Sequence, residues 1–125
     1  MSGVPIGRLD VTAIDCPDAH GLAEFYRSII GGRIIVEDLE NSGWVELHTD
    51  DGKLAFQQID RHRRPTWPEG DVPQQAHVDI NVNDLDAAEP EVLQHGAVKA
   101  EVQPSPDEFR VFIDPAGHPF CLVKP

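Results

Sequence analysis

The chain has 125 residues, 40% hydrophobic and 26% charged, so it is long and apolar enough to bury one core. Its formal net charge of −12 excludes general nucleic-acid binding, and no apolar run approaches the roughly 18 residues that cross a membrane. Two cysteines and an N-terminus without secretory features predict a reduced, cytoplasmic protein. The acidic surface either attracts a cationic small molecule or only keeps the protein soluble.

The first half of the chain predicts the element order β-α-β-β-β. Alternation over Arg8–Ile14 is typical of a strand, and Asp18 is a suitable N-cap for the helix that follows. That helix carries an apolar stripe of helical spacing and ends at Gly31. Turns are expected at Asn41-Ser42-Gly43 and Asp50-Asp51-Gly52. They separate three shorter strands, expected at Arg33–Glu37, Trp44–His48 and Leu54–Ile59.

The second half repeats this order. A strand over His77–Val82 precedes a helix that begins at about Asp86, where Glu89 completes a capping box, and Gly96 ends that helix. The closing strands are expected near Val98–Val102, Phe109–Ile113 and Pro119–Val123. Residues 61–75, rich in proline and arginine, form the linker between the halves.

The repetition is the most informative feature of the chain. The runs Leu9–Asp18 and His77–Asp86 alternate in the same way and end on an aspartate, at an offset of 68 residues. A fixed period indicates one supersecondary unit used twice to build one core. We therefore expect one domain over residues 1–125, with modules at about 7–60 and 76–125. The predicted fold is α+β, with two βαβββ modules that form a curled mixed sheet, helices outside and a ligand cup.

Side-chain alternation predicts which residues face the cup. One face of each strand is apolar and is expected under a helix, and the other carries polar groups. The face covered by a helix is expected to carry Val45, Leu47, Leu54, Phe56, Ile80, Val111 and Ile113. The cup face receives the side chains of alternate parity, which are Trp44, Glu46, His48, Gln57, His77, Asp79, Asn81, Arg110 and Phe112.

Two segments of the second half carry a family resemblance. The run HVDINVNDLDAA and the closing DPAGHPFCLV, within paired βαβββ units, resemble the vicinal oxygen chelate superfamily and its glyoxalase-like subgroup. This superfamily contains glyoxalases, bleomycin-resistance proteins and extradiol dioxygenases. The resemblance implies a small-molecule site between the modules and a homodimer in which two chains complete the cups.

The resemblance also implies a place for a metal ion. Metal-using members draw a His or Gln from the first strand and a Glu from the last strand of each module. Carried over, these positions are Leu9, Gln57, His77 and Cys121. Leucine cannot ligate, so an intact site for a hard divalent metal is not expected, although a divalent metal at His77, Gln57 and Cys121 stays possible. His77 is equally well explained as a hydrogen-bonded pocket residue, and Cys121 as an inert buried thiol.

Three further groups have a functional and a structural interpretation. Glu46 beside His48 is a candidate general acid–base pair or a solvated strand face. Trp67, flanked by prolines, is a candidate lid over an aromatic or cationic ligand, or a filler between the modules. The basic cluster Arg61–Arg64 has two interpretations, a binding site for a carboxylate or phosphate of the substrate, or a soluble linker without such a role.

Two functions follow from these features. The favoured one is a metal-independent binding protein that sequesters a cationic or aromatic small molecule, as bleomycin-resistance proteins do. The alternative is a metal-dependent glyoxalase-like enzyme, an isomerase, lyase or dioxygenase acting on a small oxygenated substrate. In the enzyme, a metal would polarise the substrate while Glu46 or His48 moves a proton.

Overall fold

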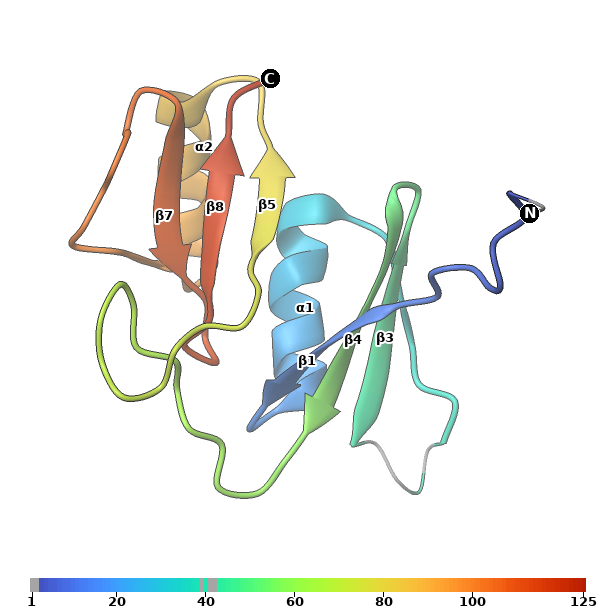
Figure 1. Ribbon diagram of the computed structural model, residues 1–125. Helices are drawn as coiled ribbons and strands as arrows, with labels where there is room; N and C mark the ends of the chain where they lie inside the picture. The colour runs from blue at the N-terminus through green and yellow to red at the C-terminus, as the bar shows by residue number, and fades with distance from the viewer. Residues whose placement is uncertain (1–2, 39, 41–42) are drawn as a thin grey trace.

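Two four-stranded sheets, each with a helix against one face, make up the protein (Figure 1). The computed structural model describes residues 3–38, 40 and 43–125. The first module contains β1 (Thr12–Cys16), α1 (Ala19–Ile30), β2 (Arg33–Ile35), β3 (Trp44–Thr49) and β4 (Gly52–Gln58). The second contains β5 (Val78–Asn81), α2 (Leu85–Gln94), β6 (Val98–Lys99), β7 (Phe109–Ile113) and β8 (Pro119–Val123). The expected fold of two βαβββ modules is confirmed, with two separate mixed sheets.

The two sheets have the same strand order and register. They run β1-β4-β3-β2 and β5-β8-β7-β6, and the first pair in each is parallel. Thr12 pairs with Leu54 in the first sheet, and Val78 pairs with Phe120 in the second. Both residues of the second pair lie 66 positions after their counterparts. The expected offset of 68 is therefore wrong by two residues.

The helix caps explain that error. Asp18 accepts a hydrogen bond from the Gly21 amide at 3.0 Å, and its counterpart is Asp84, which accepts from the amides of Asp86 and Ala87 at 2.9 and 3.2 Å. The segment NDLD offers two aspartates, and the first one caps α2. The capping box expected at Asp86 is therefore wrong, because this residue already lies in the first helical turn.

Every expected strand is present, but several begin or end at other residues than expected. The first strand begins at Thr12 rather than at Arg8, and Leu9, before the strand, is 90% exposed. The turn expected at Asn41 and Ser42 lies outside the described residues. Among the described residues, no helix has the length and apolar character needed to cross a membrane.

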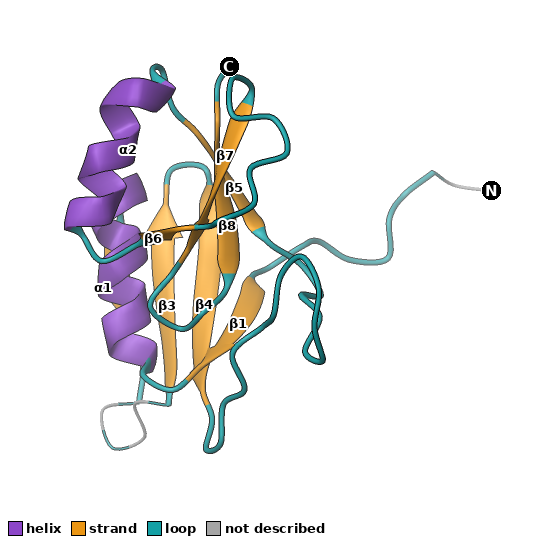
Figure 2. Cartoon of the chain, turned by 90° about the vertical axis from the view of Figure 1, so that its left-hand side faces the viewer, coloured by secondary structure: helices purple, strands orange, loops and turns teal. Residues whose placement is uncertain are grey.

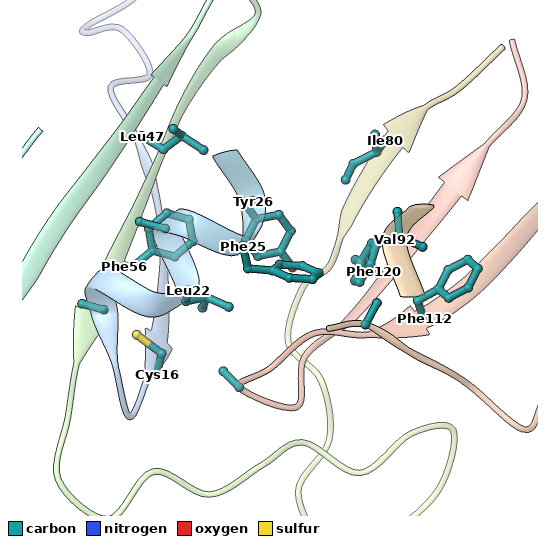
Figure 3. Packing of buried hydrophobic residues seen from close by; sticks show 14 of the residues in the cluster. Cys16, Leu22, Phe25, Tyr26, Leu47, Phe56, Ile80, Val92, Phe112 and Phe120 are labelled. Atoms are coloured by element: carbon teal, nitrogen blue, oxygen red, sulfur yellow. The ribbon is translucent and has the colours of Figure 1, made fainter. Parts of the chain in front are cut away.

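A cluster of aromatic rings around α1 joins the two modules. Figure 3 shows Phe25 and Tyr26 of α1 between Phe56 of the first sheet and Phe120 of the second. Tyr26 stacks on Phe56 with ring centroids 5.8 Å apart and meets Phe120 edge-on at 5.9 Å. Because one helix packs against strands of both modules, burial of its apolar face stabilises both together.

A buried hydrogen bond fixes the same junction. The Tyr26 hydroxyl donates to Oδ2 of Asp114, in the turn between β7 and β8, at 2.7 Å. Burial, and then the adjacent carboxyl, raise the pKa of Tyr26 well above its usual range, so the phenol keeps its proton. The other carboxyl oxygen accepts from the amides of Ala116 and His118, each at 2.9 Å. Asp114 is only 2% exposed, so these three donors replace water around its carboxyl group.

The helices cover only one face of the sheets. In Figure 2, α1 and α2 lie on one side of the molecule and the strands on the other. The faces of both sheets that turn away from the helices are therefore open on the same side. The linker passes over this side between β4 and β5.

We expect the Tyr26 bond to contribute strongly to stability. The substitution Tyr26→Phe leaves a buried Asp114 oxygen without its donor and lowers the free energy of unfolding by about 1–3 kcal/mol. Denaturant unfolding measures this change. The control is Ser28→Ala, which removes a hydrogen bond inside α1, to the Phe25 carbonyl, and no bond between modules. An equal loss in the two variants contradicts a special role for the junction.

Candidate functional site

A pocket of about 310 Å³ lies on the open face of the second sheet, and we call it the cup. Strands β5, β7 and β8 form its floor and walls, and the linker contributes Trp67 and Gln74. The walls are largely apolar and include Phe109, Val111 and Pro119. The cup is therefore an apolar hollow over a sheet whose opposite face packs on α2.

Three polar side chains converge on the floor of the cup. Alternation along the chain puts His77 and Asp79 on one face, and strand register puts Asp79 beside Cys121 of β8. Nε2 of His77 lies 3.0 Å from Oδ1 of Asp79. One donor atom from each of the three residues lies within 4.8 Å of the other two. We call this group the floor triad.

The environment of Cys121 keeps its thiol protonated. Burial first, and then the negative charge of Asp79 with its hydrogen bond, raise the pKa of Cys121 to about 11. A free thiolate is the reactive form of cysteine. At neutral pH, Cys121 is therefore a weak nucleophile unless a cation lies beside it.

A second group of predicted residues lies on the open face of the first sheet, away from the cup. Oε2 of Glu46 accepts from the Trp44 indole at 2.8 Å, and its Oε1 lies 2.7 Å from Nε2 of His48. Gln57 of β4 pairs with Trp44 in the strand register. Within one chain, the structure does not bring this group together with the floor triad.

The hydrogen bonds at Glu46 determine its ionisation. The bond from Trp44 first, and then the bond to His48, lower the pKa of Glu46 below its ordinary value of 4.5. The carboxylate is thus ionised at neutral pH and is held in one orientation. A histidine beside such a carboxylate has the arrangement of an acid–base pair.

The assignment of Arg110 to the cup is wrong. Its guanidinium contacts Asp86 at 2.7 Å and Glu89 at 3.2 Å, both on α2, on the opposite face of the sheet. Val111 lines the cup instead, and Phe112 is fully buried in the core. Strand β7 has the sequence FRVFI and carries apolar residues on both faces. The sequence pattern therefore does not distinguish its two faces, and the predicted assignment of cup face and covered face is the reverse of the observed one.

Several residues that line the cup are not predicted from the sequence, among them Phe109 and Gln74. Phe109 lies two positions before Val111 and follows from the corrected alternation of β7. Gln74 lies in the irregular linker, where no periodicity points to it. Its Oε1 atom is buried without a hydrogen-bond partner among the described residues.

Part of the basic linker contacts the turn between β7 and β8. His62 Nε2 lies 2.7 Å from the carbonyl oxygen of Ala116, and Arg64 donates to the carbonyl of Pro115 at 3.0 Å. Arg61 and Arg63 line a second, larger cavity of about 490 Å³, which lies between β1, the linker and the second-module residues Val78 and His118. The linker is thus tied to the turn between β7 and β8, which positions Trp67 at the cup.

The comparison with protein families agrees with this geometry. A family model described as a glyoxalase-like domain matches residues 11–123. The chain belongs to this family. No curated protein matches it at the sequence level.

Solved structures share the fold of this glyoxalase-like protein at low identity. Fosfomycin resistance protein FosX from Listeria monocytogenes is 14% identical with a TM-score of 0.70, covering 97% of this chain and 95% of its own. A glyoxalase/bleomycin resistance protein/dioxygenase family enzyme from Burkholderia phytofirmans PsJN is 16% identical with a TM-score of 0.68, covering 94% and 98%. FosX from Mesorhizobium loti is 17% identical with a TM-score of 0.67, covering 95% and 92%. The fold is that of the vicinal oxygen chelate superfamily.

The corrected register tests whether the metal site implied by the family resemblance fits this chain. At an offset of 66, His77 corresponds to Val11 and Cys121 to Ala55. Neither counterpart has a donor atom, and Gln57 lies two residues beyond Ala55. A hard divalent ion held by both modules, which needs oxygen and imidazole donors from each, does not fit these positions.

We expect Trp44→Phe to raise the pKa of Glu46 towards 4.5, because it removes the bond that lowers this pKa most. His48→Gln has the smaller effect. The folded pKa lies below the unfolded one, so the stabilisation from this network is present above pH 4.5 and is lost as the pH falls through the folded pKa. NMR titration of the Glu46 carboxyl carbon measures the shift. A larger rise in His48→Gln contradicts the assigned order.

Proposed function

We propose that this glyoxalase-like protein binds a small aromatic or cationic molecule in the cup and sequesters it, without the hard-metal chemistry of glyoxalases. The main support for this proposal is the cup itself, an apolar pocket of about 310 Å³ with the carboxylate of Asp79 on its floor. This volume lies within the usual range of ligand pockets, about 300–1,000 Å³. Names of structures with the same fold, which include resistance proteins, support such a role.

The charges around the cup favour a cation. Asp79 lies on the floor, and among the described residues no lysine or arginine lines the cup. A net charge of −12 adds a long-range attraction for cations. Trp67 and Phe109 supply aromatic faces, which attract both planar rings and cations.

A second copy of the chain completes the cup in this proposal. The open face of the first sheet carries Trp44, 38% exposed, beside the Glu46–His48 pair, and neither α1 nor α2 covers it. The first-sheet face of one chain closes over the second-sheet face of its partner, as the pairing known in this superfamily implies. Glu46 and His48 then face the floor triad of the other chain.

Two buried free cysteines support a reducing, cytoplasmic location.

One observation favours an enzyme as the second candidate. The pair Glu46–His48, with its 2.7 Å contact, is a preformed proton-transfer group. In the closed dimer it would act on a substrate in the partner's cup. Loss of turnover in Glu46→Gln with unchanged ligand affinity would favour this candidate, whereas a parallel loss of affinity would favour sequestration.

Ligand binding is tested with proflavine, a planar aromatic cation, by isothermal titration calorimetry in the presence of EDTA. Trp67→Ala removes a stacking face and weakens binding about three- to thirtyfold, while Trp67→Phe has a smaller effect. Asp79→Asn removes the floor charge and weakens binding about fivefold or more. Asp107→Asn, at an exposed carboxylate that does not line the cup, leaves affinity unchanged. Equal binding of anionic 2-naphthoate, or unchanged binding in Trp67→Ala, contradicts the proposal.

Assembly is tested by analytical ultracentrifugation. We expect twice the chain mass of 13.8 kDa at micromolar concentration. Trp44→Arg places a charge on the proposed interface and shifts the protein towards monomer. Val98→Arg, at an exposed residue of β6 away from that face, is the control. A monomer in the unmodified protein contradicts the dimer.

A further inference from the structure

We propose that the second cavity, which we call the linker cavity, binds a small phosphate monoester through the guanidinium groups of Arg61 and Arg63. The linker cavity has a volume of about 490 Å³, against about 310 Å³ for the cup. The inference goes beyond the proposed function, because it concerns a different cavity and a ligand of the opposite charge.

Three parts of the chain enclose the linker cavity. Strand β1 contributes Thr12 and the three residues after it, the linker contributes residues between Ile59 and Ala76, and the second module contributes Val78 and His118. The cavity therefore lies where the two modules meet within one chain. Its position does not depend on a partner subunit.

Hydrogen bonds hold the walls of the linker cavity together. Nε2 of His118, in the turn between β7 and β8, lies 2.6 Å from the carbonyl oxygen of Asp15 in β1. Nε2 of His62, in the linker, lies 2.7 Å from the carbonyl oxygen of Ala116 in the same turn. The turn is thus bonded to both other walls of the cavity. A cavity that is already formed spares a ligand the cost of ordering its walls.

Arg61 and Arg63 line this cavity without an acidic partner. In the part of the chain that the structure describes, neither guanidinium forms an ion pair or a hydrogen bond. Acidic partners are plentiful, since the chain has 22 acidic and 10 basic residues. Other basic side chains do pair with carboxylates, namely Arg27, Lys53, Lys99, Arg110 and Lys124. Two arginines in one cavity are therefore available to an anionic ligand.

The backbone of Arg61 supports a role for its side chain. Its φ of 58° lies in the left-handed region, which favours glycine. Residues held in this region collect at functional sites, where the side chain compensates for the strained backbone. An arginine at such a position is explained by its guanidinium group, which a glycine could not bring to the cavity.

The two guanidinium groups select the ligand class. Each presents a planar fork of N–H donors that matches the oxygens of a carboxylate or a phosphate. A single carboxylate has two oxygens and satisfies one fork. A phosphate monoester has three terminal oxygens and close to two negative charges at neutral pH, so it satisfies both. The apolar lining residues Ile14, Ile59 and Val72 then contact the organic part of the ester.

One carboxylate opposes an anion in the linker cavity. Asp15 of β1 also lines the cavity, and it forms no ion pair within the described ranges. The net charge of −12 adds a long-range repulsion. Binding therefore depends on the local contacts of the two arginines, and removal of the Asp15 charge strengthens it.

Isothermal titration calorimetry with phenyl phosphate, at neutral pH in the presence of EDTA, tests the site. Arg61→Gln and Arg63→Gln each weaken binding about tenfold. Asp15→Asn strengthens binding about threefold, a gain that a damaged fold cannot produce. The matched control is Arg33→Gln, at an exposed arginine of β2 that lies outside the linker cavity and leaves the affinity unchanged. Benzoate, which has the same ring and one charge, binds about tenfold more weakly than phenyl phosphate.

Several results would overturn the site. They are no binding of phenyl phosphate at millimolar concentration, unchanged affinity in both Arg61→Gln and Arg63→Gln, an equal loss in Arg33→Gln, or weaker binding in Asp15→Asn. Equal affinity for benzoate overturns the phosphate class. Arg61 and Arg63 are exposed, so their variants keep the fold.

Amide NMR locates the bound ester. Chemical-shift changes in β1 and at residues 59–65 support the linker cavity. Changes confined to the cup residues Phe109 and Val111 place the ester in the cup and overturn the inference.

The two calorimetric assays separate this inference from the proposed function. Arg63 does not line the cup, so Arg63→Gln leaves the affinity for proflavine unchanged. Binding of phenyl phosphate that depends on Arg63, without binding of proflavine, supports the linker cavity and refutes sequestration in the cup. Binding of proflavine that depends on Trp67, without binding of phenyl phosphate, refutes the phosphate site and leaves sequestration intact.

Discussion

The hydrogen bond between Tyr26 and Asp114 is the constraint on which the rest of the structure depends. It joins α1 of the first module to the turn between β7 and β8 of the second, within a shared aromatic core. The same turn also receives the linker, through carbonyl contacts with His62 and Arg64. Because Cys121 follows this turn and Trp67 belongs to the linker, the position of both at the cup depends on one buried carboxyl group.

The buried carboxyl group of Asp114 receives its hydrogen bonds without a charged partner in the core. Its three donors are a phenol and two backbone amides of its own turn, so no basic side chain has to be buried with it. The polar residues of the chain are thereby free for the open faces of the sheets. One face carries Trp44, Glu46 and His48, and the other carries the floor triad. Two copies of one structural unit thus present different chemistry.

Hydrophobic periodicity was sufficient to predict the fold, the order of the elements and most side-chain directions. It succeeded in β5, where Ile80 is buried and Asp79 faces the cup, because polar and apolar residues alternate there. It failed in β7, where both faces are apolar and Arg110 reaches two carboxylates on α2. It also left the module offset ambiguous, because Asp84 and Asp86 are both plausible caps. Gln74 could not be found, since an irregular linker has no period.

The difference between the two open faces suggests a division of roles in the proposed dimer. Around the positions that match the floor triad, the first sheet is lined with the small side chains Ala13 and Ala55. In the proposed dimer this surface would contact the body of a ligand, beside the Glu46–His48 pair. The second sheet supplies a carboxylate, an imidazole and a thiol at the equivalent depth. A molecule between the two faces would therefore be oriented by the second module and enclosed by the first. The two modules thus keep different polar groups, the Glu46–His48 pair on the first sheet and the floor triad on the second.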